Sequence, residues 1–63
     1  MKRKILLKYL KECDCVLARE GANHSIYKNK HSGLWSAIPR HSDIEETTVM
    51  KICKQLGIPK IEK

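Results

Sequence analysis

Two apolar stripes, one near each end of the chain, constrain the fold more than any other feature. Residues 3–13 and the residues from position 49 onward both repeat apolar side chains at the spacing of an amphipathic helix. The first stripe consists of Ile5, Leu6, Tyr9, Leu10 and Cys13, and the second of Val49, Ile52, Cys53 and Leu56. Each helix must bury its stripe against another element, so the middle of the chain has to supply a surface that covers both.

The middle of the chain predicts a sheet that can serve as this surface. Residues 15–20, 23–28 and 34–38 have strand character, and Pro39 closes the third segment. A bend at Gly21-Ala22 and a hairpin loop at 29–33 join them, with Gly33 suited to a positive φ. We therefore expect an α+β fold in the order α-β-β-β-α. It is a three-stranded antiparallel sheet with two helices on one face, built as a single domain over residues 1–63.

This layout is that of a double-stranded-RNA-binding domain, although topology alone does not define function. The alternation along the strands leaves open which face is buried. Ile26 and Ile38 favour the core, but so do Leu17 and Trp35.

The start of the second helix has two alternatives. Ser42-Asp43-Ile44-Glu45 matches the S-x-x-E capping box, and Thr47 is an equally good N-cap. Its end is better defined, because Gly57 is a suitable C-cap and Pro59 prevents the helix from continuing.

Charge points to an anionic partner. The chain has 13 Lys and Arg against 7 Asp and Glu, a formal net charge of +6. Residues 1–30 carry a net of +5 and residues 31–63 a net of +1, so a polyanion or an acidic protein should prefer the first half. Lys4, Lys8 and Lys11 lie opposite the first apolar stripe. They form either a solvated helix face or a ridge that meets phosphate.

Several classes are excluded by size and composition. A chain of 63 residues is too short for a large enzyme fold, and three aromatic residues argue against modules that stack several bases on a sheet. Lys8 and Lys11 interrupt the first apolar run too early for a signal peptide, and no stretch could span a membrane, so we expect a soluble, cytoplasmic protein. Three cysteines without a second ligand pair predict neither disulfides nor a metal site, and no cofactor is expected.

His24 is the candidate for chemistry. It follows the Gly21-Ala22 bend, and a hairpin would bring Arg19 and Lys28 near one another. RNA carries its own nucleophile in the 2′-hydroxyl, so cleavage needs proton transfer, for which imidazole is suited, and cations for the charge on phosphorus. The alternative is that His24 is an ordinary surface or packing residue. His31 is expected to be a plain loop residue, and His41, after Pro39-Arg40, could contact phosphate.

Three segments resemble the HicA toxin family. The run Arg-Glu-Gly-Ala-Asn-His-Ser-Ile-Tyr at 19–27 is similar to the family's central strand motif. Ile-Pro-Arg-His at 38–41, followed by an acidic stretch, and Lys-Ile-Cys-Lys-Gln-Leu-Gly-Ile-Pro at 51–59 come in the family's order and spacing. The resemblance covers nearly the whole chain.

The resemblance implies the toxin of a type II toxin–antitoxin system, an mRNA interferase that acts without the ribosome and without a metal. His24 takes the position of the family's catalytic histidine. A HicB-like antitoxin is the implied partner, and DNA would be contacted only through it. The residues expected to bind RNA are Lys4, Lys8, Arg19, Lys28, Lys30, Arg40 and His41. Two alternatives stay open, a non-catalytic double-stranded-RNA-binding module and a degenerate toxin kept for partner binding.

Two positions depart from the family pattern. The usual motif is Gly-Ser-His-His, or Gly-Asn-His in one branch, whereas this chain has Ala22 in place of the glycine and Ser25 in place of the second histidine. Ala22 is tolerable if the bend needs no positive φ there, because Gly21 is adjacent. The loss of the second histidine removes one proton carrier.

Overall fold

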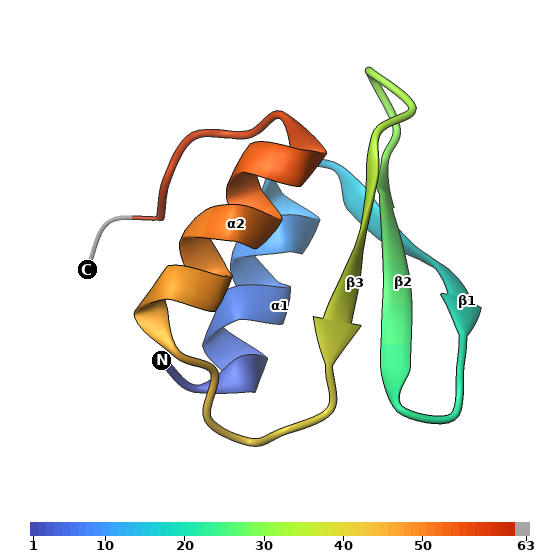
Figure 1. The fold of residues 1–63 in the computed structure, drawn as a ribbon. Coiled ribbons are helices and arrows are strands. Elements are labelled where there is room, and N and C mark those ends of the chain that lie inside the picture. The colour runs from blue at the N-terminus through green and yellow to red at the C-terminus, as the bar shows by residue number, and fades with distance from the viewer. Residues whose placement is uncertain (62–63) are drawn as a thin grey trace.

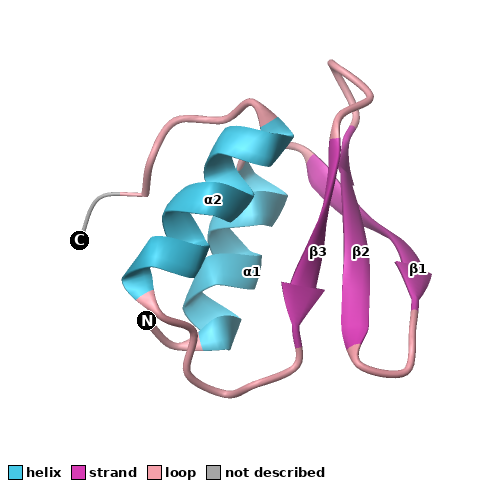
Figure 2. Ribbon diagram, in the orientation of Figure 1, coloured by secondary structure: helices cyan, strands magenta, loops and turns pink. Residues whose placement is uncertain are grey.

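The computed structural model describes residues 1–61 and contains two helices and three strands (Figures 1 and 2). In chain order these are α1 (Arg3–Glu12), β1 (Cys15–Glu20), β2 (His24–Asn29), β3 (Trp35–Pro39) and α2 (Glu46–Leu56). The predicted order α-β-β-β-α is therefore confirmed, and the predicted element bounds are right to within about one residue except at the start of α2, where the sequence had left the position open.

The sheet has the order β1-β2-β3, and both pairs of neighbouring strands are antiparallel. Both helices pack on the same side of the sheet, and its other face is uncovered (Figure 1). This confirms the predicted arrangement, whereas the expectation of a single domain over residues 1–63 stays a prediction. Within the part of the chain that the structure describes, no helix is both long and apolar enough to cross a membrane.

The structure settles the strand parity that the sequence left open. Ile38 is fully buried beneath the helices, whereas Trp35, three residues earlier, is 62% exposed on the uncovered face. Ile26 also belongs to the uncovered face, and the helix side of β2 instead carries two buried polar residues, Ser25 and Asn29. The two isoleucines therefore lie on opposite faces.

The core lies between the helices and the inner face of the sheet. Its buried apolar residues are Leu6, Leu10, Cys15, Ile38, Ile44, Val49, Ile52, Cys53 and Leu56. The stripe predicted on α2 is confirmed in full. On α1 one member of the predicted stripe is wrong: Ile5 is 50% exposed, and Leu7 packs against the core in its place. A short helix contacts the sheet along a narrow line, here centred on Leu6 and Leu10, and Ile5 falls outside it.

The capping box predicted at Ser42 does not form, and neither does a cap at Thr47. The helix α2 begins after Glu45, whose side chain makes no cap hydrogen bond. The segment before it is extended instead, because it pairs with the N-terminus: the Ser42 carbonyl accepts the Arg3 N–H at 2.8 Å, and Ile44 N–H donates to the Met1 carbonyl at 2.8 Å. Pairing with the N-terminus thus overrides the local helix signal.

Left-handed backbone conformations occur where the sequence predicts them and at one further position. Gly57 caps α2 at φ 67°, and Gly33 closes the hairpin loop at φ 79°. The third is Asp14, at φ 63°, in the turn between α1 and β1. Aspartate is one of the few side chains that tolerate this region.

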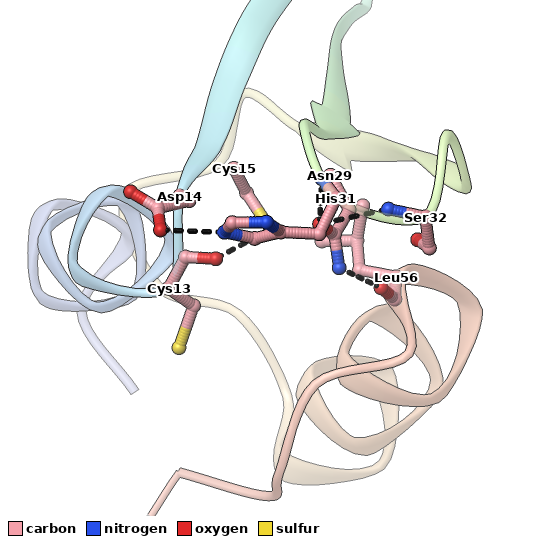
Figure 3. A network of polar contacts seen from close by, with 7 residues as sticks. All are labelled: Cys13, Asp14, Cys15, Asn29, His31, Ser32 and Leu56. Atoms are coloured by element: carbon pink, nitrogen blue, oxygen red, sulfur yellow. Dashed lines mark hydrogen bonds and ion pairs between the residues drawn. The ribbon is translucent and has the colours of Figure 1, made fainter.

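Polar side chains fasten the hairpin end of the sheet (Figure 3). The buried Asn29 amide donates to the Leu56 carbonyl at 2.8 Å, and its oxygen accepts the His31 N–H at 2.8 Å. The His31 ring in turn lies 2.7 Å from the Asp14 carboxylate. His31 is therefore not the plain loop residue that the sequence suggested, because its ring joins the hairpin to the start of β1.

Candidate functional site

His24 begins β2 at the end of the sheet opposite the hairpin, and it is exposed. Its carbonyl accepts the Gly21 N–H at 2.8 Å, which closes the turn between β1 and β2. On its other side His24 is paired with Pro39 of β3. The backbone of His24 is therefore held from both neighbouring strands while its side chain stays accessible to solvent.

Ser25 points to the opposite side of the sheet and is 1% exposed. Its hydroxyl accepts a hydrogen bond from Arg3 Nη2 at 3.0 Å and donates one to Glu20 Oε1 at 2.7 Å. Arg3 Nε also donates to the Pro39 carbonyl at 2.8 Å. The first turn of α1 is thus fixed to β2, the strand that carries His24, and to β3 beside it. A side chain at position 25 belongs to this inner network and does not share a face with His24.

Arg40 extends the network around the end of the sheet. Its guanidinium pairs with the Glu20 carboxylate and donates to the Gly21 carbonyl at 2.7 Å. These contacts hold the end of β3 against the turn that precedes His24. The same pairing offsets part of the Arg40 charge, so a phosphate at Arg40 would compete with Glu20.

A β-bulge determines where Arg19 lies. The pairing of β1 with β2 shifts between Leu17 and Arg19, so that Arg19 is opposite Ile26 and Glu20 is opposite Ser25. Without the extra residue Arg19 would be opposite Ser25, on the helix side, because side chains alternate along a strand. The bulge therefore moves Arg19 to the uncovered face and brings Glu20 to Ser25.

The uncovered face, here called the open sheet face, carries two of the predicted cations. Its positions on the three strands are Val16, Ala18, Arg19, His24, Ile26, Lys28, Trp35 and Ala37. Lys28 is directly opposite Trp35, and Arg19 and Lys28 line one open hollow together with Ile26 and Trp35. The face that carries His24 therefore also carries Arg19 and Lys28, whereas the sequence predicted only that a hairpin would bring their strands together.

The other predicted cations lie elsewhere. Lys4 and Lys8 line a groove between α1 and β1, and Lys4 also shares a hollow with Arg40 beside the start of α1. Lys30 lies in the hairpin loop, where its N–H donates to the Asp14 carbonyl at 3.0 Å, far along the sheet from His24. His41 is exposed in the loop after Arg40. The predicted set is thus divided among several surfaces and does not form one patch.

Sequence reasoning missed the network that positions His24. The sequence predicted no role for Arg3 or for the Glu20 side chain, and Ser25 was noted only as the replacement of a second histidine. Alternation along the strand gave the opposite signal, because the apolar Ile26 favours the core and would place its neighbour Ser25 on the outward face. The bulge that supplies Glu20 as a partner of Ser25 has no signature in the sequence.

The cysteines are free and are not placed as nucleophiles. Burial raises the pKa of the Cys15 thiol, and burial is also the main cause of the raised pKa of Cys53. Both therefore stay protonated and unreactive near neutral pH. Among residues 1–61, no three His, Cys, Asp or Glu side chains gather in a way that would hold a metal ion.

These features define a class of small basic α+β domains, in which an accessible histidine starts the central strand of a sheet with one face open. Residues 3–58 match the family model described as the HicA toxin of bacterial toxin–antitoxin systems. The match covers most of the chain, which belongs to the HicA toxin family. No curated protein and no solved structure matches the chain.

Proposed function

We propose that this toxin is an endoribonuclease that cleaves mRNA without the ribosome, with His24 as its catalytic residue. The observation that carries the proposal is the placement of His24, whose side chain is exposed at the first position of β2 while its backbone is held on both sides. Membership of the HicA family supports the same assignment.

The reaction uses the nucleophile that RNA supplies. His24 accepts the proton of a 2′-hydroxyl as its oxygen bonds to the adjacent phosphorus, and the bond from phosphorus to the 5′-oxygen breaks. The products are a 2′,3′-cyclic phosphate and a 5′-hydroxyl. The leaving 5′-oxygen takes its proton from the imidazolium or from water. General acid–base catalysis by one positioned side chain typically increases the reaction rate by about 10²- to 10⁴-fold, and it needs no metal ion.

Arg19 and Lys28 on the open sheet face are the cations proposed to hold the RNA backbone. Arg40 has a different role in this proposal, since its guanidinium is committed to Glu20 and to the turn before His24. It acts mainly as a positioning residue, together with Arg3.

A HicB-like antitoxin is the proposed partner. The net charge of +6 favours an acidic protein, and a partner that covers His24 would block the reaction. Contact with DNA, in this proposal, is made only by the antitoxin.

Induction in cells tests the function. Wild type should arrest growth and deplete total mRNA, and co-expression of the protein encoded beside it should restore both. His24→Ala should do neither while accumulating as a folded protein, and His31→Ala, which alters an exposed histidine at the other end of the sheet, should behave as wild type. The proposal fails if His24→Ala depletes mRNA as fast as wild type.

Binding without cleavage is the competing function, and the presence of Ser25 in place of a second histidine favours it. It predicts a salt-dependent complex with duplex RNA in which the strands stay intact. A gel of RNA incubated with the purified protein distinguishes the two functions.

A further inference from the structure

The open sheet face has a composition that neither the fold nor the acid–base chemistry requires. Trp35, the only tryptophan of the chain, is 62% exposed there, although a large aromatic side chain gains most when it is covered. It lies on an outer strand of the sheet and directly opposite Lys28. It does not belong to the hydrophobic core, so its indole is a flat apolar surface free for a ligand.

The charges around Trp35 are all positive. Arg19 and Lys28 line the same hollow as Trp35, and Ile26 contributes an apolar side chain to it. Among residues 1–61, no acidic side chain belongs to the open sheet face, because Glu20 is turned toward Ser25 and the remaining acids lie on helices and loops. An anion with a flat apolar part is the chemistry that complements this surface.

The distance between the hollow and His24 restricts which anions could contact both. His24, Ile26 and Lys28 occupy every second position of β2 and so share one face. The lysine therefore lies about 14 Å from the histidine along the strand. A ligand that reaches both must be extended, with repeated negative charges. A single nucleic-acid strand has this form, whereas the bases of a duplex are stacked on each other and cannot reach a protein aromatic ring.

We propose that the open sheet face binds single-stranded RNA, with one unpaired base stacked on the indole of Trp35 and backbone phosphates at Arg19 and Lys28. The strand then runs along β2 to His24. This inference rests on the proposed function and names its substrate class, unpaired RNA. The β-bulge in β1 agrees with this proposal, because the bulge turns Arg19 to the open sheet face.

Trp35 is itself the reporter for the first test. His24→Ala keeps the RNA intact, and titrating it with a single-stranded decamer should quench the fluorescence of Trp35 as the complex forms. A decamer with abasic sites should bind about fivefold to a hundredfold more weakly and quench little, because stacking is lost. A duplex of equal length that quenches as strongly as the single strand would overturn the proposal.

Variants in the His24→Ala background separate stacking from charge, with anisotropy of a labelled decamer as the readout. Trp35→Leu should weaken binding about fivefold to a hundredfold at every salt concentration. Arg19→Ala and Lys28→Ala should each lower the slope of log affinity against log salt by about 0.7. Lys54→Ala, which removes the same charge from α2, should leave that slope nearly unchanged. Circular dichroism confirms that each variant is folded.

The outcomes distinguish this inference from the proposed function. Binding that depends on Trp35, together with wild type that never cleaves RNA, would leave the inference standing and remove the nuclease. If cleavage needs His24 but Trp35→Leu binds the decamer as tightly as the parent, the nuclease proposal stands and the inference about Trp35 is wrong. If Trp35→Leu keeps its RNA affinity and loses affinity for the antitoxin, the face is a protein interface and the inference is wrong.

Discussion

Arg3 and Ser25 are joined beneath the sheet, where Arg3 Nη2 donates to the Ser25 hydroxyl at 3.0 Å. The hydroxyl in turn donates a hydrogen bond to the Glu20 carboxylate, and Glu20 pairs with Arg40. This chain of polar contacts links α1, the turn before His24 and the end of β3. The residue next to His24 therefore fixes the strand from the inner side, while His24 faces solvent.

Replacing this hydroxyl should be costly. Ser25→Ala leaves Arg3 and Glu20 without their shared partner in a partly buried site, so we expect a loss of about 1–3 kcal/mol in the free energy of unfolding. Ser42→Ala is the matched control: its side chain caps no helix, and the change should stay within about 0.5 kcal/mol. Urea unfolding measures both. Equal losses in the two variants would contradict the network described here.

Two adjacent residues of α1 test where the helix meets the core. Leu6 is fully buried and Ile5 is 50% exposed. We expect Leu6→Ala to cost about 2–5 kcal/mol, which is enough to unfold much of a domain of this size, and Ile5→Ala to cost less than about 1 kcal/mol. Thermal unfolding of the two variants gives the comparison. A larger loss in Ile5→Ala would mean that α1 is rotated relative to the sheet.

Stability should depend on pH through Asp14. The hydrogen bond with His31 lowers the pKa of the Asp14 carboxyl below its usual value, so the folded protein holds this proton less tightly than the unfolded chain does. The resulting stabilisation is present above the unfolded pKa and is lost as the pH falls through the folded one. The Tm of wild type should therefore exceed that of Asp14→Asn at pH 5–6, and the difference should shrink toward pH 2.

Asparagine is a suitable replacement because it also tolerates the left-handed backbone at position 14. His31→Gln should remove the same pH-dependent difference, since it removes the partner of the carboxylate. A difference in Tm that stays constant down to pH 2 would show that Asp14 does not act through this pair.

The three thiols should differ in reactivity. Cys15 and Cys53 are buried, and their raised pKa values keep them as thiols at pH 7.5, whereas Cys13 is only half-buried. Because the thiolate is the reactive form, iodoacetamide should modify Cys13 first. Peptide mass spectrometry should find the other two modified only after denaturant is added. Modification of all three at one rate in the folded protein would contradict the burial described.

The sequence predicted the fold well because its signals are local and agree with one another. The stripe of α2, the glycine that ends it and the turn at Gly33 each depend on neighbours in the chain, and each is confirmed. The S-x-x-E pattern at Ser42 is also local, but the partner that overrides it is the N-terminus, about forty residues away. Local patterns cannot show such pairing.

The candidate site was predictable only in part. His24 stands out because the turn before it and the family motif both identify it, and the structure leaves it accessible. The residues that position it were not predictable, because they come from α1, from β1 and from the loop after β3. The face of Arg19 depends on a one-residue bulge, which alternation along a strand cannot reveal.

The rate of RNA cleavage by purified protein tests the central claim most directly. Wild type, His24→Ala and His31→Ala would each be incubated in excess over a labelled single-stranded RNA in the presence of EDTA, after their folds are verified. We predict that wild type and His31→Ala cleave at similar rates and that His24→Ala is slower by about a hundredfold or more. A folded His24→Ala protein that cleaves at the rate of wild type would contradict the account.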